Sequence, residues 1–402
     1  MPRQTTYSSI TIVTIVTCLL VPAAMAASVA PVSVTAPGKS VSGYDQPRKE
    51  ILDVLHAPSP PVANVSPTQD NILLVAWQDY PAMARVATPF LRLAGVRIEP
   101  KNHSKHDTPG GYGIKPCARS FALVNIASGK QTALELPVGA CPESPQWSAD
   151  GKRFAFTNIA ADSVELWVGE VASGKAHKVP GARLNPMFNG ELQWMPDQKT
   201  LLVKLVPDGM GAPPAKPLVP SGPSIQETGA EKGQSSTYEN RDTLGSKHDE
   251  DLFDYYAAAQ PAFVDASSSV ITRIGKPGNY ESLDPAPDGK HLLVTAIHKP
   301  YSYVTTYERF PQNIDVWDVS NRAKILIQNI ASLPLADRVP IHGVPVGPRQ
   351  HAWRATEPAT LVWVEALDGG DWNVKVPSRD KVLMQKAPFT VPALEIARTE
   401  QR

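Results

Sequence analysis

Apolar and polar positions alternate in short runs along this chain, and one phrase of strand, polar turn and apolar strand returns five times. The copies read WSADGKRFAF at residues 147–156, WMPDQKTLLV at 194–203, PAPDGKHLLV at 285–294, and more loosely VSPTQDNILLV at 65–75 and WRATEPATLVWV at 353–364. Alternation over short runs bounded by turn residues predicts β-strands. A repeated unit of this kind predicts copies that stack on one another, so that no copy folds alone.

The spacing of two markers gives the size of the unit. A second hairpin turn, ASGK, occurs at residues 127–130 and again at 172–175, and the opening phrases at 147 and 194 are a similar distance apart. A unit of this length with two hairpins is typical of a four-stranded propeller blade. A matching second hairpin of the fourth unit is expected around residues 315–321. The sequence therefore predicts an all-β fold, a β-propeller with about five four-stranded blades.

The unit starts are unevenly spaced, which predicts insertions between the repeats, the largest at about residues 207–260. Its Pro/Gly-rich first half is expected to be an extended loop and its polar middle, residues 226–246, to be mobile. Its end, KHDEDLFDYYA at 247–257, is expected to form a short helix with acidic residues in the first turn. A calcium loop is the alternative for Asp249, Glu250, Asp251 and Asp254, but these residues lack the alternating ligands and central glycine of such a loop.

Composition and charge narrow the class of protein. There are 40 prolines among 402 residues, which disfavours long helices because proline removes a donor and clashes with the preceding turn. The formal net charge is zero, from 39 basic and 39 acidic residues, so no nucleic-acid partner and no anionic membrane surface is expected.

The N-terminus has the pattern of a secretory signal peptide. Arg3 precedes an apolar run at 10–22, which ends before the small residues around Ala26. We expect residues 1–26 to be the signal peptide, cleaved after Ala26, with an uncleaved anchor as the alternative. Residues 27–55 are expected to be a mobile Pro/Ala/Ser-rich leader with one or two helical turns near 51–55, and residues 56–402 the partial propeller. The protein is thus expected to be exported, periplasmic or secreted, with no membrane association after cleavage.

Export would leave two cysteines, Cys117 and Cys141. A hairpin that turns at Gly129, midway between them, would place the two nearly opposite each other. An oxidising compartment then favours a disulfide, and the alternative is two separate buried thiols.

Other candidate residues have a structural interpretation beside the functional one. The histidine pairs His103 with His106 and His291 with His298 lack further zinc ligands nearby, so we expect no metal site and no cofactor. The GGYG stretch at 110–113 lacks the Gly-Lys-Ser/Thr of a phosphate loop and is expected to be a crossing between strands. Tryptophans 147, 194 and 353 open the repeat phrases and are expected to pack between blades rather than to stack on a ligand.

Several blocks of the sequence resemble one family of enzymes. The blocks are LAGVRI at 93–98, KPLVPSGP at 216–223, DLFDYY at 251–256, IHKPYS at 297–302, RFP at 309–311, WR at 353–354 and DGGD at 368–371. Each block is short, but together, spread from about residue 43 onward, they resemble the glutamyl endopeptidases of the prolyl oligopeptidase family of serine peptidases. The resemblance implies a propeller of seven or so blades over a C-terminal α/β-hydrolase domain that carries a Ser-Asp-His triad and cuts after glutamate. It also implies that the propeller admits peptides and excludes folded proteins.

The chain departs from the family at its C-terminal side. The nucleophile elbow G-x-S-x-G occurs nowhere in it, so no catalytic residue is assigned and the substrate-binding residues are unknown. Arg97, Arg309 and Arg354 fall in or beside family-like blocks; one of them could pair with a glutamate carboxylate, although ion pairing within a blade is the default. His298 is expected to be structural or to line the channel.

We therefore expect an incomplete propeller, truncated before the catalytic domain, that gates substrate access and is inactive by itself. Its expected partners are the missing blades and hydrolase domain, in the same or a separate chain, and peptides in the intact enzyme. The alternative is a self-contained periplasmic propeller that binds a peptide or a protein, and a degenerate protein without function is the third possibility.

Overall fold

The computed structural model describes residues 46–108, 113–218, 241–322, 324–339 and 342–402. The predicted signal peptide, most of the predicted leader, residues 110–112 of the GGYG stretch and most of the polar segment at 226–246 lie outside the described residues. The chain divides into two compact units, residues 1–57 and 58–402. In the first unit the described residues form helix α1 (Lys49–Leu55), which contains the helical turns expected near residues 51–55.

The second unit holds the sheets, which are made of short strands. The first sheet contains β1 (Val62–Val65), β2 (Asn71–Trp77), β5 (Ala118–Asn125) and β6 (Gln131–Ala133), and the second β7 (Gln146–Trp147), β8 (Arg153–Ile159), β9 (Val164–Glu170) and β10 (Lys175–Leu184). The third contains β11 (Leu192–Trp194), β12 (Thr200–Leu205), β13 (Gln260–Asp265) and β14 (Ile271–Arg273), and the fourth β15 (Tyr280–Pro285), β16 (His291–Ile297), β17 (Gln312–Asp318) and β18 (Leu326–Leu333). The fifth contains β19 (Pro348–Trp353), β20 (Thr360–Ala366), β21 (Asp380–Lys386) and β22 (Leu394–Thr399). Between them lie helix α2 (Met83–Val86), the hairpin β3 (Leu91–Leu93) and β4 (Val96–Ile98), helix α3 (Lys247–Ala257) and the 3₁₀ turn η2 (Tyr307–Arg309).

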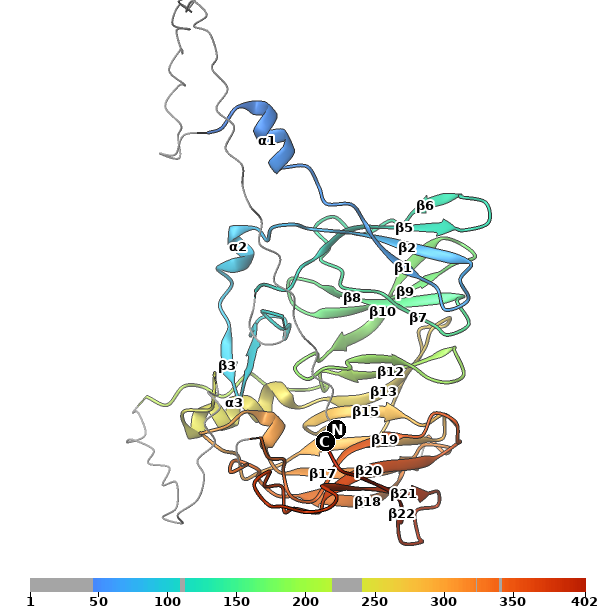
Figure 1. Ribbon diagram of the computed structural model, residues 1–402. Coiled ribbons are helices and arrows are strands. Elements are labelled where there is room, and N and C mark those ends of the chain that lie inside the picture. The colour runs from blue at the N-terminus through green and yellow to red at the C-terminus, as the bar shows by residue number, and fades with distance from the viewer. Residues whose placement is uncertain (1–45, 109–112, 219–240, 323, 340–341) are drawn as a thin grey trace, which may run out of the picture. The chain divides into compact units, whose positions relative to one another are not determined.

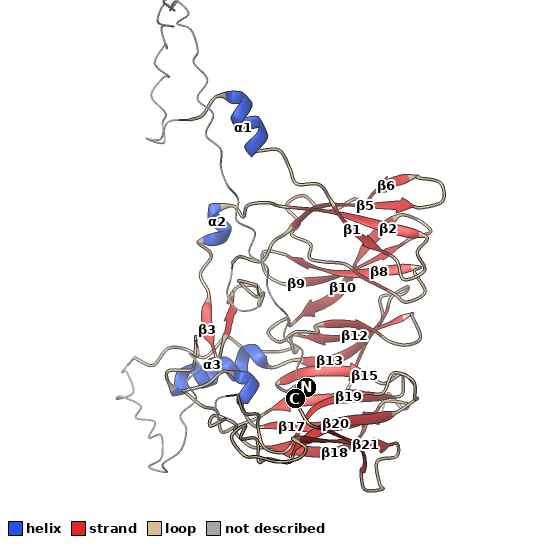
Figure 2. Ribbon diagram, viewed as in Figure 1, coloured by secondary structure: helices blue, strands red, loops and turns tan. Residues whose placement is uncertain are grey.

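Each group of four strands is an antiparallel meander in chain order, as in a propeller blade (Figures 1 and 2). The second and third groups are joined into one larger sheet by a single β10–β12 pair, Leu184 with Leu205. Five four-stranded blades are therefore present, and each begins at or near a repeat phrase found in the sequence. The predicted all-β propeller fold is confirmed, and so is the second hairpin of the fourth blade, formed by β17 and β18.

Consecutive blades pack face to face through their alternating apolar side chains. Phe121 of the first blade meets Phe156 of the second edge to face, with ring centroids 5.0 Å apart. Leu166 of the second blade shares a core with Val203 of the third, and comparable clusters join the third blade to the fourth and the fourth to the fifth. Burial of these apolar faces is the main force that holds neighbouring blades together.

The tryptophans that open the repeat phrases also join neighbouring blades by hydrogen bonds. The indole N–H of Trp147 donates to the carbonyl of Asn64, that of Trp194 to Gln146, and that of Trp353 to Asp284, at 2.9–3.2 Å. In each case the acceptor residue comes immediately before the first residue of the repeat phrase of the preceding blade, which is Val65, Trp147 or Pro285. The expected packing between blades is confirmed, and the hydrogen bond explains why tryptophan occupies this position.

The two edges of the blades differ in construction. One, the turn edge, is made of tight turns such as residues 66–70, 148–152, 195–199 and 286–290, and of the second hairpin turns such as 126–130 and 171–174. The opposite edge, the insertion edge, is made of the described residues in the longer links 78–117, 206–259, 298–311 and 367–379, and in the connections between blades. The alternating direction of a meander brings all these links to one edge, where α2, β3 and α3 appear in Figure 1.

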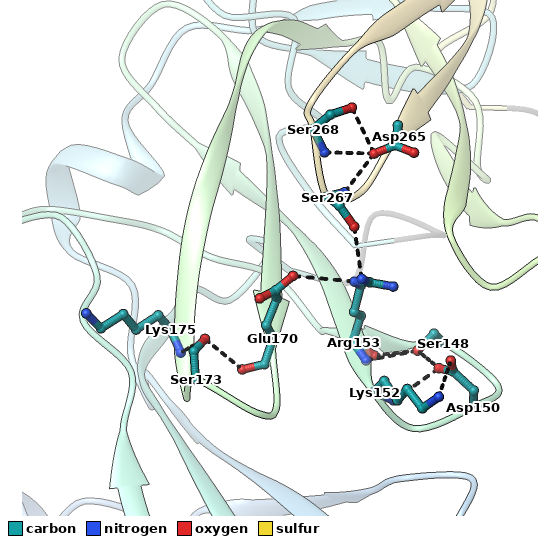
Figure 3. A network of polar contacts seen from close by, with 10 residues as sticks. All are labelled: Ser148, Asp150, Lys152, Arg153, Glu170, Ser173, Lys175, Asp265, Ser267 and Ser268. Carbon is teal, nitrogen blue, oxygen red and sulfur yellow. Dashed lines mark hydrogen bonds and ion pairs between the residues drawn. The ribbon is translucent and has the colours of Figure 1, made fainter.

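Short-range polar contacts organise the turn edge, as Figure 3 shows for the second and third blades. Asp150 accepts hydrogen bonds from the hydroxyl of Ser148 and the backbone N–H of Lys152. Arg153 reaches the next blade and donates to the hydroxyl of Ser267 at 2.9 Å. The aspartates of these turns thus fix the local backbone, the role that such residues play in turns generally.

Cys117 and Cys141 are joined by a disulfide in the structure, with their Cα atoms 4.6 Å apart. The hairpin does turn at Gly129, but the β5–β6 ladder covers only three residue pairs, from Ala122 with Ala133 to Val124 with Gln131. Cys141 instead lies against β8, where its N–H bonds the Asn158 side chain and its carbonyl accepts from Ile159. The bridge therefore ties the first blade to the entry of the second, and oxidation of the pair in the cell stays a prediction.

Candidate functional site

The insertion edge has an apolar core of its own, built from three insertions. Leu93 and Ile98 of the β3–β4 hairpin, Phe253 and Tyr256 of α3, and Phe310 are buried together in it. Phe253 meets Phe310 edge to face, with centroids 5.6 Å apart. Insertions from the first, third and fourth blades therefore form one packed layer, which can hold functional side chains in fixed positions.

Helix α3 begins and ends on specific polar contacts. The Ser246 hydroxyl accepts from the backbone N–H of Asp249 at the N-terminus, and the Asn185 side chain donates to the carbonyls of Tyr256 and Ala258 at the C-terminus, both at 2.8 Å. These contacts satisfy backbone groups that a helix leaves unpaired at its ends. The helix predicted for residues 247–257 is confirmed with the same bounds.

The acidic residues of α3 pair with lysine and tyrosine side chains. The Nζ of Lys299 lies 2.6 Å from Asp254, which also accepts from the hydroxyl of Tyr301. Glu250 accepts from the hydroxyl of Tyr303 at 2.9 Å. Within the part of the chain that the structure describes, no group of three or more His, Cys, Asp or Glu side chains is arranged to hold a metal ion.

A cavity of about 590 Å³ opens at the insertion edge between the fourth and fifth blades. Its walls come from β15, β17, η2 and β19 and from the connection between the two blades, and they include Glu281, Arg309, Arg349 and His351. This volume is in the range of small-molecule and peptide sites. A second cavity, of about 170 Å³, is lined by His103, Arg183, Tyr255 and Arg273, among others.

A buried lysine bonds the backbone of Glu281, which lines the larger cavity. The Nζ of Lys204, in β12, donates to the carbonyls of Asn189 and Glu281 at 2.8 and 2.9 Å and, at longer distances, to those of Phe188 and Tyr280. Burial lowers the pKa of Lys204 to about 7. Burial likewise raises the pKa of the neighbouring Glu281 carboxyl to about 7, and this carboxyl accepts from the amide of Gln312 at 2.8 Å. Glu281, which lines the cavity, and Lys204, which bonds its carbonyl, therefore have pKa values far from their ordinary ranges, a feature that clusters at functional sites.

A network of arginines and aspartates lies behind the β19 wall of the cavity. Arg349 pairs with Asp380, Arg402 pairs with both Asp380 and Asp368, and Arg379 pairs with Asp368 at 2.9 Å. Although burial acts to raise the pKa of Asp368, hydrogen bonds from Arg402 and Arg379 hold it below its ordinary value, so this carboxylate is ionised at neutral pH.

The three arginines singled out in the sequence have separate environments. Arg97 pairs with Asp107 and Asp242 at 2.9 and 2.7 Å inside the insertion edge. Arg354 pairs with Glu357 at 2.8 Å on the turn edge, far along its strand from the cavity. Arg309 lines the cavity, and its guanidinium donates to the carbonyl of Ala336 at 3.4 Å. Arg309 is therefore the one of the three that stands at the candidate site.

The histidines noted in the sequence are likewise dispersed. His106 is buried with its Nδ1 2.9 Å from Glu99, and His103 packs against Tyr256. His291 bonds Asp288 at 2.7 Å on the turn edge, whereas His298 is exposed with its Nδ1 2.6 Å from the carbonyl of Lys299. Neither pair comes together as a site.

Sequence reasoning missed Lys204, Glu281, Arg349 and His351. Lys204 did leave a signal, because it is the one charged residue in the apolar run TLLVKLV at 200–206. A lysine in a strand that is buried on both faces must have a polar partner. The other three carried no local signal, because their partners come from other blades or other strands.

Two curated proteins are similar to this chain in sequence. The chain is 36% identical over 362 residues to a probable chloroplastic glutamyl endopeptidase of Oryza sativa subsp. japonica, covering 87% of this chain and 37% of that protein. It is also 36% identical over 359 residues to the protein of the same description from Arabidopsis thaliana, covering 86% of this chain and 36% of that protein. The chain thus spans little more than a third of the length of these curated relatives. No family model matches it.

Solved structures show only a distant likeness. The β-propeller domain of the Trilobed protease from Pyrococcus furiosus is 11% identical, with a TM-score of 0.40, and the match covers 84% of this chain and 71% of that chain. The propeller assignment therefore rests on the strand topology described above. The sequence comparison confirms the resemblance found from the short blocks: this chain is similar to two probable glutamyl endopeptidases over little more than a third of their length.

Proposed function

We propose that this chain is the propeller portion of a glutamyl-endopeptidase-like serine peptidase, which restricts access to a hydrolase domain and is not catalytic by itself. The observation that carries the proposal is the 36% identity over 87% of the chain to a relative of which the match covers only 37%. The absence of G-x-S-x-G from the sequence supports the non-catalytic role, because that elbow positions the nucleophile of an α/β-hydrolase.

Two sheet faces support the proposed partner, which is a set of further blades with a hydrolase domain, in the same or a separate chain. Ile72 and Leu74 of β2 and Val362 and Val364 of β20 are only partly buried and belong to no core cluster of the described residues. They alternate with the residues that pack on the second and fourth blades. Blades bury both faces in a propeller, so further blades are the partner that fits these two faces.

Export to the periplasm or the exterior is part of the proposal and rests on the N-terminal pattern with cleavage after Ala26. The two relatives are described as chloroplastic, so their names also indicate transport to a compartment other than the cytosol. No helix among the described residues is long and apolar enough to cross a membrane.

The alternative function is a stand-alone propeller that binds a peptide or a protein. One observation favours it: residues of the fourth and fifth blades line a cavity of about 590 Å³, a volume in the range of ligand sites.

Treatment of the purified 402-residue chain with a fluorophosphonate probe tests the non-catalytic role, with a known serine hydrolase as the positive control. We expect no labelling, because the probe reacts with an activated serine. Covalent labelling of this chain would overturn that part of the proposal. Gating is tested in a longer polypeptide that contains this sequence and a hydrolase domain: a short glutamate-containing peptide should be cut, and the same sequence within a folded protein should not.

A further inference from the structure

Strand β19 is distorted where it forms the wall of the larger cavity. Its pairing with β20 shifts register between Arg349 and Ala352, and Gln350 has a φ of +56°, in the left-handed region that glycine favours. A non-glycine residue with left-handed backbone angles has a conformational cost, and a bulge changes the direction of the neighbouring side chains. Such distortions gather at binding sites, and here the flanking residues are Arg349 and His351.

The charged network behind this wall has an excess of one positive charge. Arg349, Arg379 and Arg402 contribute three guanidinium groups, and Asp368 and Asp380 contribute two carboxylates. All five side chains are largely buried, with exposed fractions of 16% or less. An uncompensated charge in such a setting is costly, so the network favours a further anion.

Two residues that line the cavity, Arg349 and His351, each have a buried polar atom without a partner in the described part of the chain. The Nη1 atom of Arg349 and the Nε2 atom of His351 are buried and have no hydrogen-bond partner among the described residues. The His351 ring is held by stacking on Trp363, with centroids 5.7 Å apart. A buried polar atom without a partner is rare in folded proteins and points to a group that the protein alone does not supply.

We propose that the cavity between the fourth and fifth blades binds a carboxylate group of a peptide, through the guanidinium of Arg349 and the Nε2 atom of His351. A guanidinium that donates one N–H to Asp380 retains donors for a second carboxylate, and such charge-assisted bonds are the strong ones. A small rotation of side chains would bring the two buried atoms to the ligand, a scale of change that is common on binding. The choice of a peptide as the ligand rests on the proposed function, whereas the choice of a carboxylate rests on the site.

The acidic residues of the cavity do not supply this carboxylate. Glu281 accepts from Gln312, and burial raises its pKa to about 7, which reduces its negative charge at neutral pH. Glu308 accepts from the hydroxyl of Thr306 at 2.6 Å. Asp337 also lines the cavity. None of the three pairs with Arg349 among the ion pairs of the described residues.

Titration calorimetry on the full chain with three peptides tests the proposal and separates the two sources of a peptide carboxylate. The peptides are acetyl-Ala-Glu-Ala-amide, which has only a side-chain carboxylate, acetyl-Ala-Gln-Ala with a free C-terminal carboxylate, and acetyl-Ala-Gln-Ala-amide, which has neither. We expect at least one of the first two to bind and the third to bind at least roughly tenfold more weakly, because hydrogen bonds to a charged group are lost. No binding, or equal binding of all three, would overturn the proposal.

Three variants locate the site. Arg349→Gln should weaken binding roughly tenfold or more, and His351→Phe, which keeps the stacked ring and leaves the arginine network intact, should weaken it several-fold. Arg354→Gln, on the turn edge of the same blade, should bind as the unmodified chain does. If both His351→Phe and a folded Arg349→Gln bind the peptide as tightly as the unmodified chain, the assignment is contradicted. If Arg349→Gln does not fold, the affinity of His351→Phe alone decides. The titration requires no hydrolase domain, so its outcome is separate from that of the gating proposal.

Discussion

At the turn edge, the aspartate of each well-formed repeat bonds the backbone two residues ahead in its own turn: Asp150 with Lys152, Asp197 with Lys199 and Asp288 with Lys290. At the insertion edge, by contrast, some polar groups form hydrogen bonds with residues that are distant in the sequence. Lys204 bonds the carbonyl of Glu281, which is 77 residues away. The turn edge is therefore organised largely by a local contact that recurs in three repeats, whereas the insertion edge also depends on single contacts between distant parts of the chain.

This difference places the chemically unusual groups at one edge of the molecule. Repeated local turns fix the register of each blade and leave little room for chemistry. The insertion edge contains the partly charged groups Lys204 and Glu281, the left-handed Gln350 and the larger cavity. Binding residues are commonly found on loops positioned by a rigid scaffold, and the insertion edge has that arrangement.

The largest effect is expected from Lys204→Met at the insertion edge. Methionine keeps most of the volume but leaves the carbonyls bonded by Nζ without a donor, so we expect a loss of ~3 kcal/mol in the free energy of unfolding. Urea unfolding at pH 7 measures it. Lys199→Met, at an exposed position on the turn edge of the same strand, should change stability by less than ~0.5 kcal/mol. Equal effects of the two substitutions would remove the proposed contrast between the edges.

The disulfide is expected to contribute a similar amount. It closes a loop with a sequence separation of 24 residues, so its removal in the double variant Cys117→Ala, Cys141→Ala should cost ~3 kcal/mol. Thermal unfolding with and without reductant measures the effect. Reductant should lower the melting temperature of the parent chain and leave that of the double variant unchanged. An unmodified parent that is insensitive to reductant would show that the bridge is absent or contributes nothing.

Glu281 should make stability depend on pH. Its pKa is raised by burial from the ordinary value to about 7 in the folded state, so the folded chain holds a proton that the unfolded chain has lost. The resulting stability is fully present below about pH 4.5 and is lost as the pH rises through about 7, on the order of 1–3 kcal/mol. Glu281→Gln should remove this fall relative to the parent chain when both are unfolded in urea from pH 4.5 to 8. Parallel pH profiles of the two proteins would exclude the effect.

The bonds of the tryptophans between blades should contribute less. Trp147→Phe keeps an aromatic ring but removes the hydrogen bond to the carbonyl of Asn64, and we expect a loss of ~1 kcal/mol. Trp353→Phe removes the equivalent bond to Asp284 and should cost about as much as Trp147→Phe. Chemical unfolding of both variants compares them. A large cost at one site with none at the other would show that the repeat position is not equivalent in the two blades.

An effect of similar size to that of the tryptophan variants is expected at one of the glycines of the turn edge. Gly289 has a φ of +65°, and a Cβ there would make only ordinary van der Waals contact with Pro196, at 3.7 Å or more, so Gly289→Ala should cost ~1 kcal/mol through backbone strain. Gly151 has a φ of +67°, but a Cβ there would lie 2.1 Å from the Thr68 hydroxyl of the neighbouring blade. Gly151→Ala should therefore cost more than Gly289→Ala in the same unfolding measurement. The reverse order would contradict the packing of the first blade on the second at this edge.

The turn edge could be predicted from the sequence because its contacts are local. The phrase SADGK at 148–152 contains the aspartate, the glycine and the turn in five consecutive residues. Helix α3 was predictable for the same reason, since Ser246 and the acidic first turn stand next to the apolar residues that it buries.

The candidate site could not be predicted in this way. Arg349 was unremarkable in the sequence because Asp380 and Arg402, which define its charge environment, lie 31 and 53 residues further on. The pairing of Cys117 with Cys141 was predicted from a hairpin, but the hydrogen-bonded ladder of that hairpin does not reach either cysteine. The two cysteines come together because the first blade packs beside the second, where Cys141 bonds Asn158. Contacts between blades depend on how the blades stack, which the pattern of one strand does not contain.

Immunoprecipitation of the native protein with an antibody against the turn edge, followed by fluorophosphonate labelling and intact mass, tests the central claim most directly. The account predicts a labelled serine hydrolase in the precipitate, either in a longer polypeptide that contains this sequence or in a separate chain bound to it. A precipitate with no labelled hydrolase, or a label on a polypeptide that ends with this sequence, would contradict it.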